Sequence, residues 1–441
     1  MAGPHAQLPA VHSNSNWLGY RCVVCGHEYA RSHRGFVCDD CGIDGILDVV
    51  YDLRSVARGL SGGMPFGHDG VGGLWRFAAL LPITPETAHS AWTCGATPVH
   101  RADRLADHLG LDSLVLKDDT GLPSASLKDR AAAVAIAHAS QLGINHLACA
   151  STGNAAASLA VLSARAGMAC TIFVPADAPR AKLAQLLLHG ARVIPVTGSY
   201  DQAFDLSLRE IANHKWYSRN CAHNPLLVEG KKTATLELVA DLTAQFSGSN
   251  DALPHAVFVP VGDGCIVSSV AKAFRELEKV GLINRVPRVY GVQADGAAPL
   301  ARAWNSAGRN AADMKGPEIL TAIEPVTAST VADSISVGVP RNRVKAWRGV
   351  ARTGGGFVAV PDEAIIEAIG LLAARAGVFA EPSGAAGLAG VVAALEKGWI
   401  TARDRVAVLV TGNGLKDPEV ALAGIKIPPG VDPIDPAENP R

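Results

Sequence analysis

The chain has 441 residues, 48% of them hydrophobic, and its 40 basic residues against 41 acidic ones give a formal net charge of −1. This length and apolar content predict a large core in more than one domain. Because there is no basic excess, we expect neither a nucleic-acid partner nor a membrane-binding arm. No secretory signal and no apolar run long enough to span a bilayer are visible, so a cytoplasmic protein is expected. Nine cysteines, an odd number, favour a reducing compartment over a disulfide framework.

Two cysteine pairs stand out near the start of the chain. Residues 1–19 lack periodicity and are predicted to be a flexible tail. Residues 20–52 then carry two CxxC pairs, each followed by glycine, at Cys22, Cys25, Cys38 and Cys41. Four thiolates in this pattern can hold Zn²⁺ tetrahedrally. The alternative is a ribbon that has lost its metal and packs its thiols as small apolar groups.

The main body is predicted at residues 53–425, followed by a proline-rich tail at 426–441. From about residue 113, strand-like apolar runs alternate with helical runs, which predicts a mostly parallel sheet with helices on both faces. Functional residues in such sheets gather at the carboxyl ends of the strands. The predicted strands are 113–117, 146–150, 170–174, 191–196, 256–261, 288–293, 357–360 and 405–411, and helices are predicted at 128–142, 154–166 and 265–280.

Lys128 lies where the first of these strands turns into a helix, within the stretch Leu122–Arg130. Helix-end potential and partial burial both disfavour an ammonium group there, so we expect a lowered lysine pKa. A neutral amine is what Schiff-base chemistry requires. A solvated Lys-Asp-Arg triplet at a helix start is the alternative that this stretch alone leaves open.

Two loops at predicted strand ends can bind anions. Ala150–Asn154 offers small polar side chains and free helix amides to a carboxylate, although Ser, Thr and Asn are also ordinary helix caps. Val261–Ile266 contains glycines whose neighbouring amides suit a phosphate dianion. Asp263 in that loop is unfavourable for a phosphate unless it turns away or pairs with a cation.

The remaining polar positions have simpler explanations. Thr411 ends the last predicted strand, where its hydroxyl can hydrogen-bond a ring nitrogen or simply begin a turn. The loop at Glu381 is explained by helix capping. Cys94, Cys149, Cys170 and Cys221 lack partner spacing and are predicted to be buried small residues.

Taken together, these motifs resemble the threonine synthases and serine/threonine dehydratases, in the fold type II (tryptophan synthase β) family of pyridoxal-phosphate enzymes. The resemblance covers roughly residues 20–425 and includes, in order, the cysteine ribbon, SxKDR, STGN, Lys182–Gln185, Glu229–Thr233 and TGxGLKDP. It implies an α/β fold with two parallel-sheet domains, the smaller and mobile one at about 130–220. It also implies a homodimer that acts on a small amino-acid substrate.

The same resemblance implies a pyridoxal 5′-phosphate site. Lys128 would carry the Schiff base, Asn154 would bind the phenolic oxygen, and Thr411 would face the pyridine nitrogen. The phosphate cup would be formed by Gly262, Asp263, Gly264, Cys265 and Ile266. The substrate would meet Ser126, Ser151 and Thr152.

One departure from the family pattern concerns the substrate. Threonine synthases usually have an arginine that binds the phosphate of O-phosphohomoserine where this chain has Leu227. An alkyl chain cannot neutralise a phosphate, so we expect a lyase that eliminates or replaces a group at Cβ or Cγ of another amino acid.

Several alternatives stay open. One is an authentic threonine synthase that uses another phosphate cation. Others are a serine/threonine dehydratase-like enzyme and an O-phosphoserine β-replacement enzyme. A fourth is a non-catalytic regulatory homologue, against which the retained Lys128, Asn154 and Thr411 argue.

Overall fold

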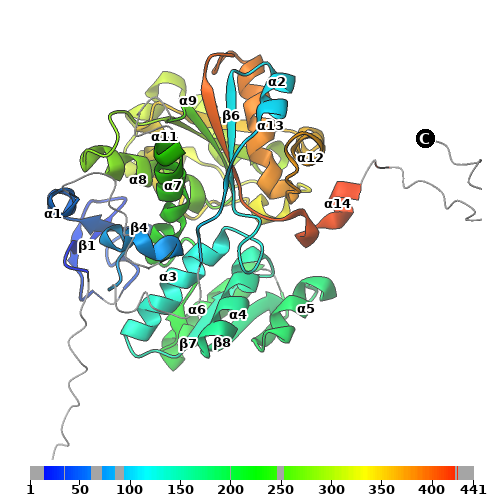
Figure 1. Ribbon diagram of the computed structural model, residues 1–441. Helices are drawn as coiled ribbons and strands as arrows, with labels where there is room; N and C mark the ends of the chain where they lie inside the picture. The colour runs from blue at the N-terminus through cyan, green and yellow to red at the C-terminus, as the bar shows by residue number, and fades with distance from the viewer. Residues whose placement is uncertain are drawn as a thin grey trace, which may run out of the picture.

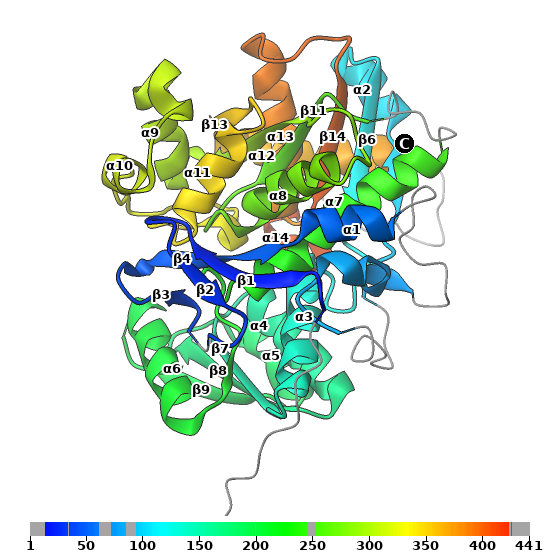
Figure 2. The ribbon, with the colours of Figure 1, turned by 90° about the vertical axis from the view of Figure 1, so that its left-hand side faces the viewer.

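The computed structural model describes residues 14–33, 35–60, 72–84, 94–198, 200–245, 253–422 and 425, and these ranges form three β-sheets (Figure 1). The N-terminal sheet lies across the junction between the other two, beside α8 (Cys265–Lys279) and α11 (Arg343–Ala351) above and α3 (Lys128–Gln141) below (Figure 2). The proline-rich tail predicted at 426–441 and residues 1–13 lie outside the described residues. No helix in the described ranges combines the length and the hydropathy that crossing a membrane would require.

The N-terminal sheet is antiparallel and corrects the predicted tail boundary. Its first strand begins at Trp17, so the boundary predicted at residue 19 falls inside a strand. The Asn14 amide donates to the Ala78 carbonyl at 2.7 Å, and the Trp17 ring is buried. Composition alone could not reveal this anchoring, because it depends on contacts with the main body. The strand order is β2-β1-β4-β3, with β1 (Trp17–Cys22), β2 (Glu28–Ala30), β3 (Val37–Cys38) and β4 (Gly42–Tyr51), followed by α1 (Leu53–Gly59) and a 3₁₀ helix at Gly73–Leu80.

The largest sheet has six strands in the order β13-β12-β11-β14-β6-β5, and all neighbours pair in parallel except β5 with β6. Its strands are β5 (Val99–Arg101), β6 (Ser113–Asp118), β11 (Ala256–Pro260), β12 (Arg288–Ala294), β13 (Gly356–Val360) and β14 (Arg405–Val410). One face is covered by α7 (Leu226–Gln245), α8 (Cys265–Lys279), α9 (Pro299–Ala307) and α11 (Arg343–Ala351). The other face is covered by α2 (Asp103–Leu109), α12 (Asp362–Leu371) and α13 (Pro382–Glu396). The short helices α10 (Gly316–Ala322) and α14 (Pro418–Leu422) complete this body.

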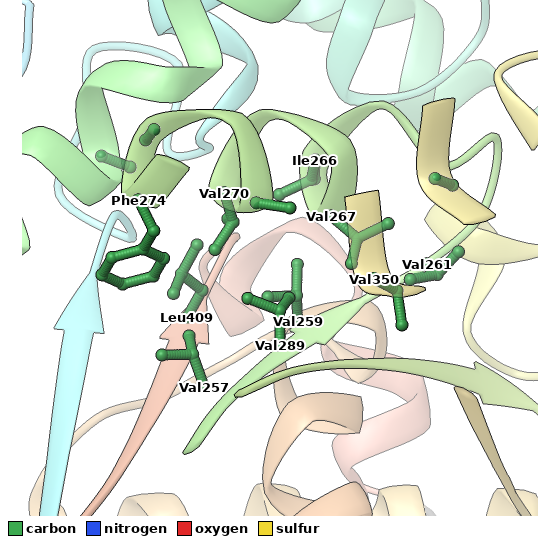
Figure 3. Close-up of a cluster of buried hydrophobic side chains, with 14 of the residues drawn as sticks. Val257, Val259, Val261, Ile266, Val267, Val270, Phe274, Val289, Val350 and Leu409 are labelled. Carbon is green, nitrogen blue, oxygen red and sulfur yellow. The ribbon is translucent and has the colours of Figure 1, made fainter. Parts of the chain in front are cut away.

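Both faces of this sheet are buried against helices. Successive strand residues point to opposite faces, so each strand contributes to two apolar clusters. Val257 and Val259 of β11 pack beneath Val270 and Phe274 of α8 (Figure 3). Phe258, between them, belongs to the apolar cluster on the opposite face. Burial on both faces explains the continuous apolar strands in the sequence.

The smaller sheet is wholly parallel, in the order β10-β7-β8-β9. Alanine-rich α3 and α4 pack on one of its faces, and α6 packs on the other. Its elements are β7 (His146–Ala150), β8 (Ala169–Pro175), β9 (Arg192–Val196), β10 (Tyr217–Ser218), α3 (Lys128–Gln141), α4 (Asn154–Ala166), α5 (Arg180–Leu188) and α6 (Tyr200–His214).

The strands and helices that the sequence predicts are confirmed to within one residue at each end.

The largest sheet and the smaller parallel sheet meet at the end of β14 and the start of α3. The Leu127 amide donates to the Thr411 carbonyl at 2.9 Å, and Ser126 forms an isolated bridge with Gly412. These contacts fasten the carboxyl end of β14 to the start of α3.

Candidate active site

Lys128 begins α3 and lines two adjoining cavities, of 60 and 540 Å³. Burial lowers the pKa of its amine, and the neighbouring cations Lys231 and Arg219 lower it further, while Cys221 and Glu381 oppose them. The direction predicted from its position at a helix start is therefore confirmed. A lowered pKa favours the neutral amine, which is the form that acts as a nucleophile or a base.

The loop before Lys128 is held rigidly by its own helix. Asp129 accepts hydrogen bonds from the Ser124 amide at 2.6 Å and from the Ser124 hydroxyl at 2.5 Å. Ala125, between the two serines, has φ of +61°, a conformation that is unfavourable for a side chain. The Ala125 carbonyl accepts from the Asn413 amide at 3.0 Å, which holds this turn against the end of β14.

Two residues after Lys128, the Arg130 guanidinium sits in a fully buried ion-pair network beneath the site. It donates to Asp119 at 2.8 Å and to Glu237 at 2.7 Å. Lys117 of β6 also donates to Glu237 at 2.9 Å, and Thr97 completes the network. These contacts connect α3, β6 and α7, so they hold the helix that carries Lys128 in place.

Asn154 begins α4 and faces a carboxylate that is distant in the sequence. Its amide donates to both Glu381 carboxylate oxygens, at 2.8 and 3.0 Å, and to the Ser334 hydroxyl at 3.1 Å. Burial raises the pKa of Glu381, although the bond from Asn154 and the nearby Lys128 lower it in part. Sequence reasoning assigned Glu381 only to helix capping, because nothing local indicates its contact with Asn154.

The glycine loop after β11 lines the smaller cavity with all five predicted residues, Gly262, Asp263, Gly264, Cys265 and Ile266. Gly264 has φ of +89°, and a Cβ there would lie 2.7 Å from the Ala346 Cβ, so only glycine fits. Asp263 accepts from the Arg341 amide at 3.1 Å. The amides at the start of α8 are therefore available to an anion.

Of the other predicted site residues, three line a cavity and Ser126 does not. Thr411 lies next to the end of β14 and lines the smaller cavity, while Ser151 and Thr152 line the larger one. Ser126 is fully buried and lines neither cavity, so its substrate contact stays a prediction.

Cys221 corrects a prediction, because it is not an inert buried thiol but lines both cavities. Its sulfur accepts from the Arg219 guanidinium at 3.0 Å and from the Lys231 ammonium at 3.7 Å. Burial raises the pKa of this thiol, but the cations Lys231, Arg219 and Lys128 outweigh burial and lower the pKa to about 7. Little in the sequence indicates this contact, because the start of α7 lies between Cys221 and Lys231 in the chain.

We expect Cys221 to react with iodoacetamide in the cofactor-free protein with a rate that rises through pH 7. The thiolate is the reactive form, and its fraction grows as pH passes the pKa. Mass spectrometry of tryptic peptides measures the rate. Cys149 is the internal control, because burial raises the pKa of its thiol to about 12. Labelling of Cys149 as fast as Cys221 would contradict this assignment.

The four ribbon cysteines converge as the spacing predicts. The sulfurs of Cys22, Cys25, Cys38 and Cys41 lie within 4.8 Å of one another, a candidate metal centre. A Cβ at Gly45 would lie 2.5 Å from the Cys41 Cβ and 2.8 Å from the Cys38 Cβ, so glycine is needed for this approach. The donor set suits zinc.

We expect about one zinc ion per chain in purified protein, and about none in Cys25→Ser, because three thiolates hold zinc far more weakly than four. Elemental analysis measures the metal, and thermal unfolding measures its effect on stability. Cys221→Ser is the matched control and should keep the zinc. A zinc-free wild-type protein that is as stable as a zinc-reconstituted one would contradict a structural metal.

The sequence of this chain is similar to a known enzyme family and to characterised members of it. The family model described as "Pyridoxal-phosphate dependent enzyme" matches residues 93–412. The threonine synthase of Methanocaldococcus jannaschii is 35% identical over 92% of this chain and 95% of its own length. That of Methanosarcina acetivorans is 33% identical over 93% and 95%.

Solved structures show the same fold. The processed form of threonine deaminase isoform 2 from Solanum lycopersicum is 22% identical, with a TM-score of 0.59 over 75% of this chain and 88% of that one. A diaminopropionate ammonia lyase from Escherichia coli is 17% identical, with a TM-score of 0.62 over 82% and 96%. At these identities both are likenesses in fold alone.

Proposed function

The chain belongs to the family of pyridoxal-phosphate dependent enzymes, as a lyase of the threonine synthase and dehydratase type, and we propose that it eliminates or replaces a group at Cβ or Cγ of an amino acid. One observation carries this proposal. Lys128, the Ser151–Asn154 loop and the Gly262–Ile266 loop converge on two cavities that share the lysine.

The residues present fit pyridoxal 5′-phosphate. The Ser383 hydroxyl is buried beside Lys128 and has no hydrogen-bond partner among the described residues. The left-handed Gly264 and the first amides of α8 form a cradle that a side chain would fill. Thr411 offers a hydroxyl on the same cavity wall. We propose that the glycine loop holds the cofactor phosphate, that Lys128 forms the Schiff base and that Asn154 binds the phenolic oxygen.

When bound, the cofactor supplies an electron sink for a carbanion at the substrate Cα. Lys128 can take up the α-proton, because a lowered pKa favours the neutral form of its amine. Ser151, Thr152 and the first amides of α4 can hold the substrate carboxylate. Glu381 lies on the wall of the smaller cavity with Lys128, and its raised pKa favours the protonated carboxyl.

Leu227, in the first turn of α7, bears on which leaving group the site accepts. Leu227 is fully buried in the apolar cluster that contains Ala131, and it lines neither cavity. No cation at this position is available to a phosphate ester. We therefore propose a substrate without a phosphate ester, such as a β-hydroxy amino acid.

A second candidate is an authentic threonine synthase, which one observation favours. Lys231, one turn after Leu227 on α7, is buried and lines the smaller cavity with Lys128. Its ammonium can supply the missing positive charge, and the curated relatives named above are threonine synthases.

Phosphate release from O-phospho-L-homoserine separates the two candidates, with the visible absorption of the lysine-bound cofactor followed in the same cuvette. The first candidate predicts that absorption without phosphate release, and turnover of a β-hydroxy amino acid such as L-serine instead. Fast release with threonine as product would establish the second candidate. Lys231→Gln should then slow the release, whereas Lys397→Gln, at an exposed lysine outside the cavities, should not. Protein that binds no cofactor would overturn both.

A further inference from the structure

A second polar cavity, of 180 Å³, lies between the N-terminal ribbon and the large domain. Its walls come from β1 and β4 on one side and from α8 and α11 on the other, which lie side by side in Figure 2. Six basic side chains line it, whereas Asp48 is the one acidic side chain among its described wall residues. The basic residues are Arg21, Lys272, Arg275, Lys345, Arg348 and Arg352.

Half of this positive charge is already compensated within the protein. Lys272 pairs with Asp48 at 3.1 Å and with Glu229 at 2.7 Å. Lys345 shares Asp48 at 3.2 Å. Arg21 pairs with Glu28 at 2.6 Å on the exposed edge of the ribbon.

The other three, Arg275, Arg348 and Arg352, form no ion pair with any carboxylate in the described ranges. Arg348 donates to the Val23 carbonyl instead, which fixes its guanidinium at the cavity wall. Burial and then repulsion from Arg352 lower the pKa of both Arg275 and Arg348, although Asp48, Glu276 and Glu278 oppose this at Arg275. Three guanidinium groups without a carboxylate partner among the described residues therefore line one cavity, in a chain whose net charge is only −1.

A solvated basic surface would keep its arginines apart, because each then gains hydration without repulsion. Here two of the three are partly buried and are held in place by packing of the ribbon against the domain. Thiolates of a zinc-loaded ribbon add some negative charge beside Arg348, since Cys22 also lines the cavity.

We propose that this cavity binds a small, multiply charged phosphate-bearing metabolite between Arg275, Arg348 and Arg352. Guanidinium groups bind phosphate oxygens with paired, charge-assisted hydrogen bonds, and three of them match a dianion or a diphosphate. A volume of 180 Å³ suits such a group.

The position of the cavity connects it to the active site. Arg275 and Lys272 lie on α8, whose first residue belongs to the glycine loop. On α11, Ala346 abuts Gly264 of that loop, and Arg348 is two residues further on. A bound anion would hold the ribbon, α8 and α11 together, so it acts as an effector that stabilises the cofactor site from behind.

Isothermal titration of the zinc-containing holoenzyme with pyrophosphate tests the proposal, because the active-site phosphate position is then filled by the cofactor. We expect one site per chain, and binding weakened roughly tenfold in Arg352→Gln and further in Arg275→Gln/Arg352→Gln. Arg309→Gln, at an exposed arginine outside the cavity, is the matched control and should bind like the wild type. The visible absorption should be the same in every variant.

Two results would overturn the proposal. One is pyrophosphate binding that is absent in the wild type or equal in all variants. The other is binding of a single-stranded oligonucleotide without binding of pyrophosphate, which would assign the basic residues to a macromolecule. Because the visible absorption is recorded separately, failure here is distinguishable from failure of the proposed catalytic function.

Discussion

Replacing Lys128 by alanine should abolish turnover and the visible absorption of the bound cofactor while leaving the fold intact. The amine is proposed both to anchor the cofactor and to move the α-proton, and proton transfer alone contributes roughly 10²–10⁴-fold. The fold should persist, because alanine is the best helix former and the side chain lines a cavity rather than the core. Absorption spectroscopy, product formation and circular dichroism measure the three effects.

Lys128→Arg is the control for charge. A guanidinium keeps a cation at the start of α3 but stays protonated, so it can neither form a Schiff base nor accept a proton. We expect it to be as inactive as the alanine variant. If the visible absorption survived in Lys128→Ala, the anchoring role would pass to Lys231, the other lysine on the smaller cavity.

Glu237→Gln should lower the free energy of unfolding by about 3–5 kcal/mol, the largest stability effect we expect. The Glu237 carboxylate is buried and accepts from Arg130, from Lys117 and from the Ala96 amide at 2.8 Å. An amide leaves Arg130 with Asp119 as its remaining carboxylate and Lys117 with only Asp241, at 4.0 Å. Denaturant unfolding of the holoenzyme measures the change.

The matched control is Asp103→Asn, whose pair with Arg101 at 3.2 Å is exposed. Exposed pairs contribute less than about 1 kcal/mol, so this variant should be close to the wild type. A similar loss in both variants would contradict the buried network as a source of stability.

The same carboxylate predicts an acid dependence of stability. Burial raises the pKa of Glu237, but Arg130 and Lys117 outweigh burial and hold the pKa well below its usual range. A folded-state pKa below the unfolded one gives stability that is present at neutral pH and lost as pH falls below about 4. Unfolding curves between pH 7 and pH 3 should therefore converge for wild type and Glu237→Gln.

Eight strands, three helices and the loops at Lys128, Asn154, Gly264 and Thr411 could be predicted from the sequence. Continuous apolar runs and helical runs depend on neighbours in the chain, and so did the placement of Lys128 at a helix start and of the four ribbon cysteines. Glycine at 264 was informative for the same reason, since a backbone conformation is a local property.

Only the tertiary structure decided which side chains share a cavity. Glu381 meets Asn154 across 227 residues of chain, and Cys221 meets Lys231 across a helix start. Leu227 could be recognised as a departure from a family pattern, but its place in the apolar core was visible only in the fold. The three arginines behind the glycine loop lie on α8 and at the end of α11, which no sequence period relates. Such contacts depend on how sheets and helices pack, and many sequences with the same periodicity would bring different side chains together.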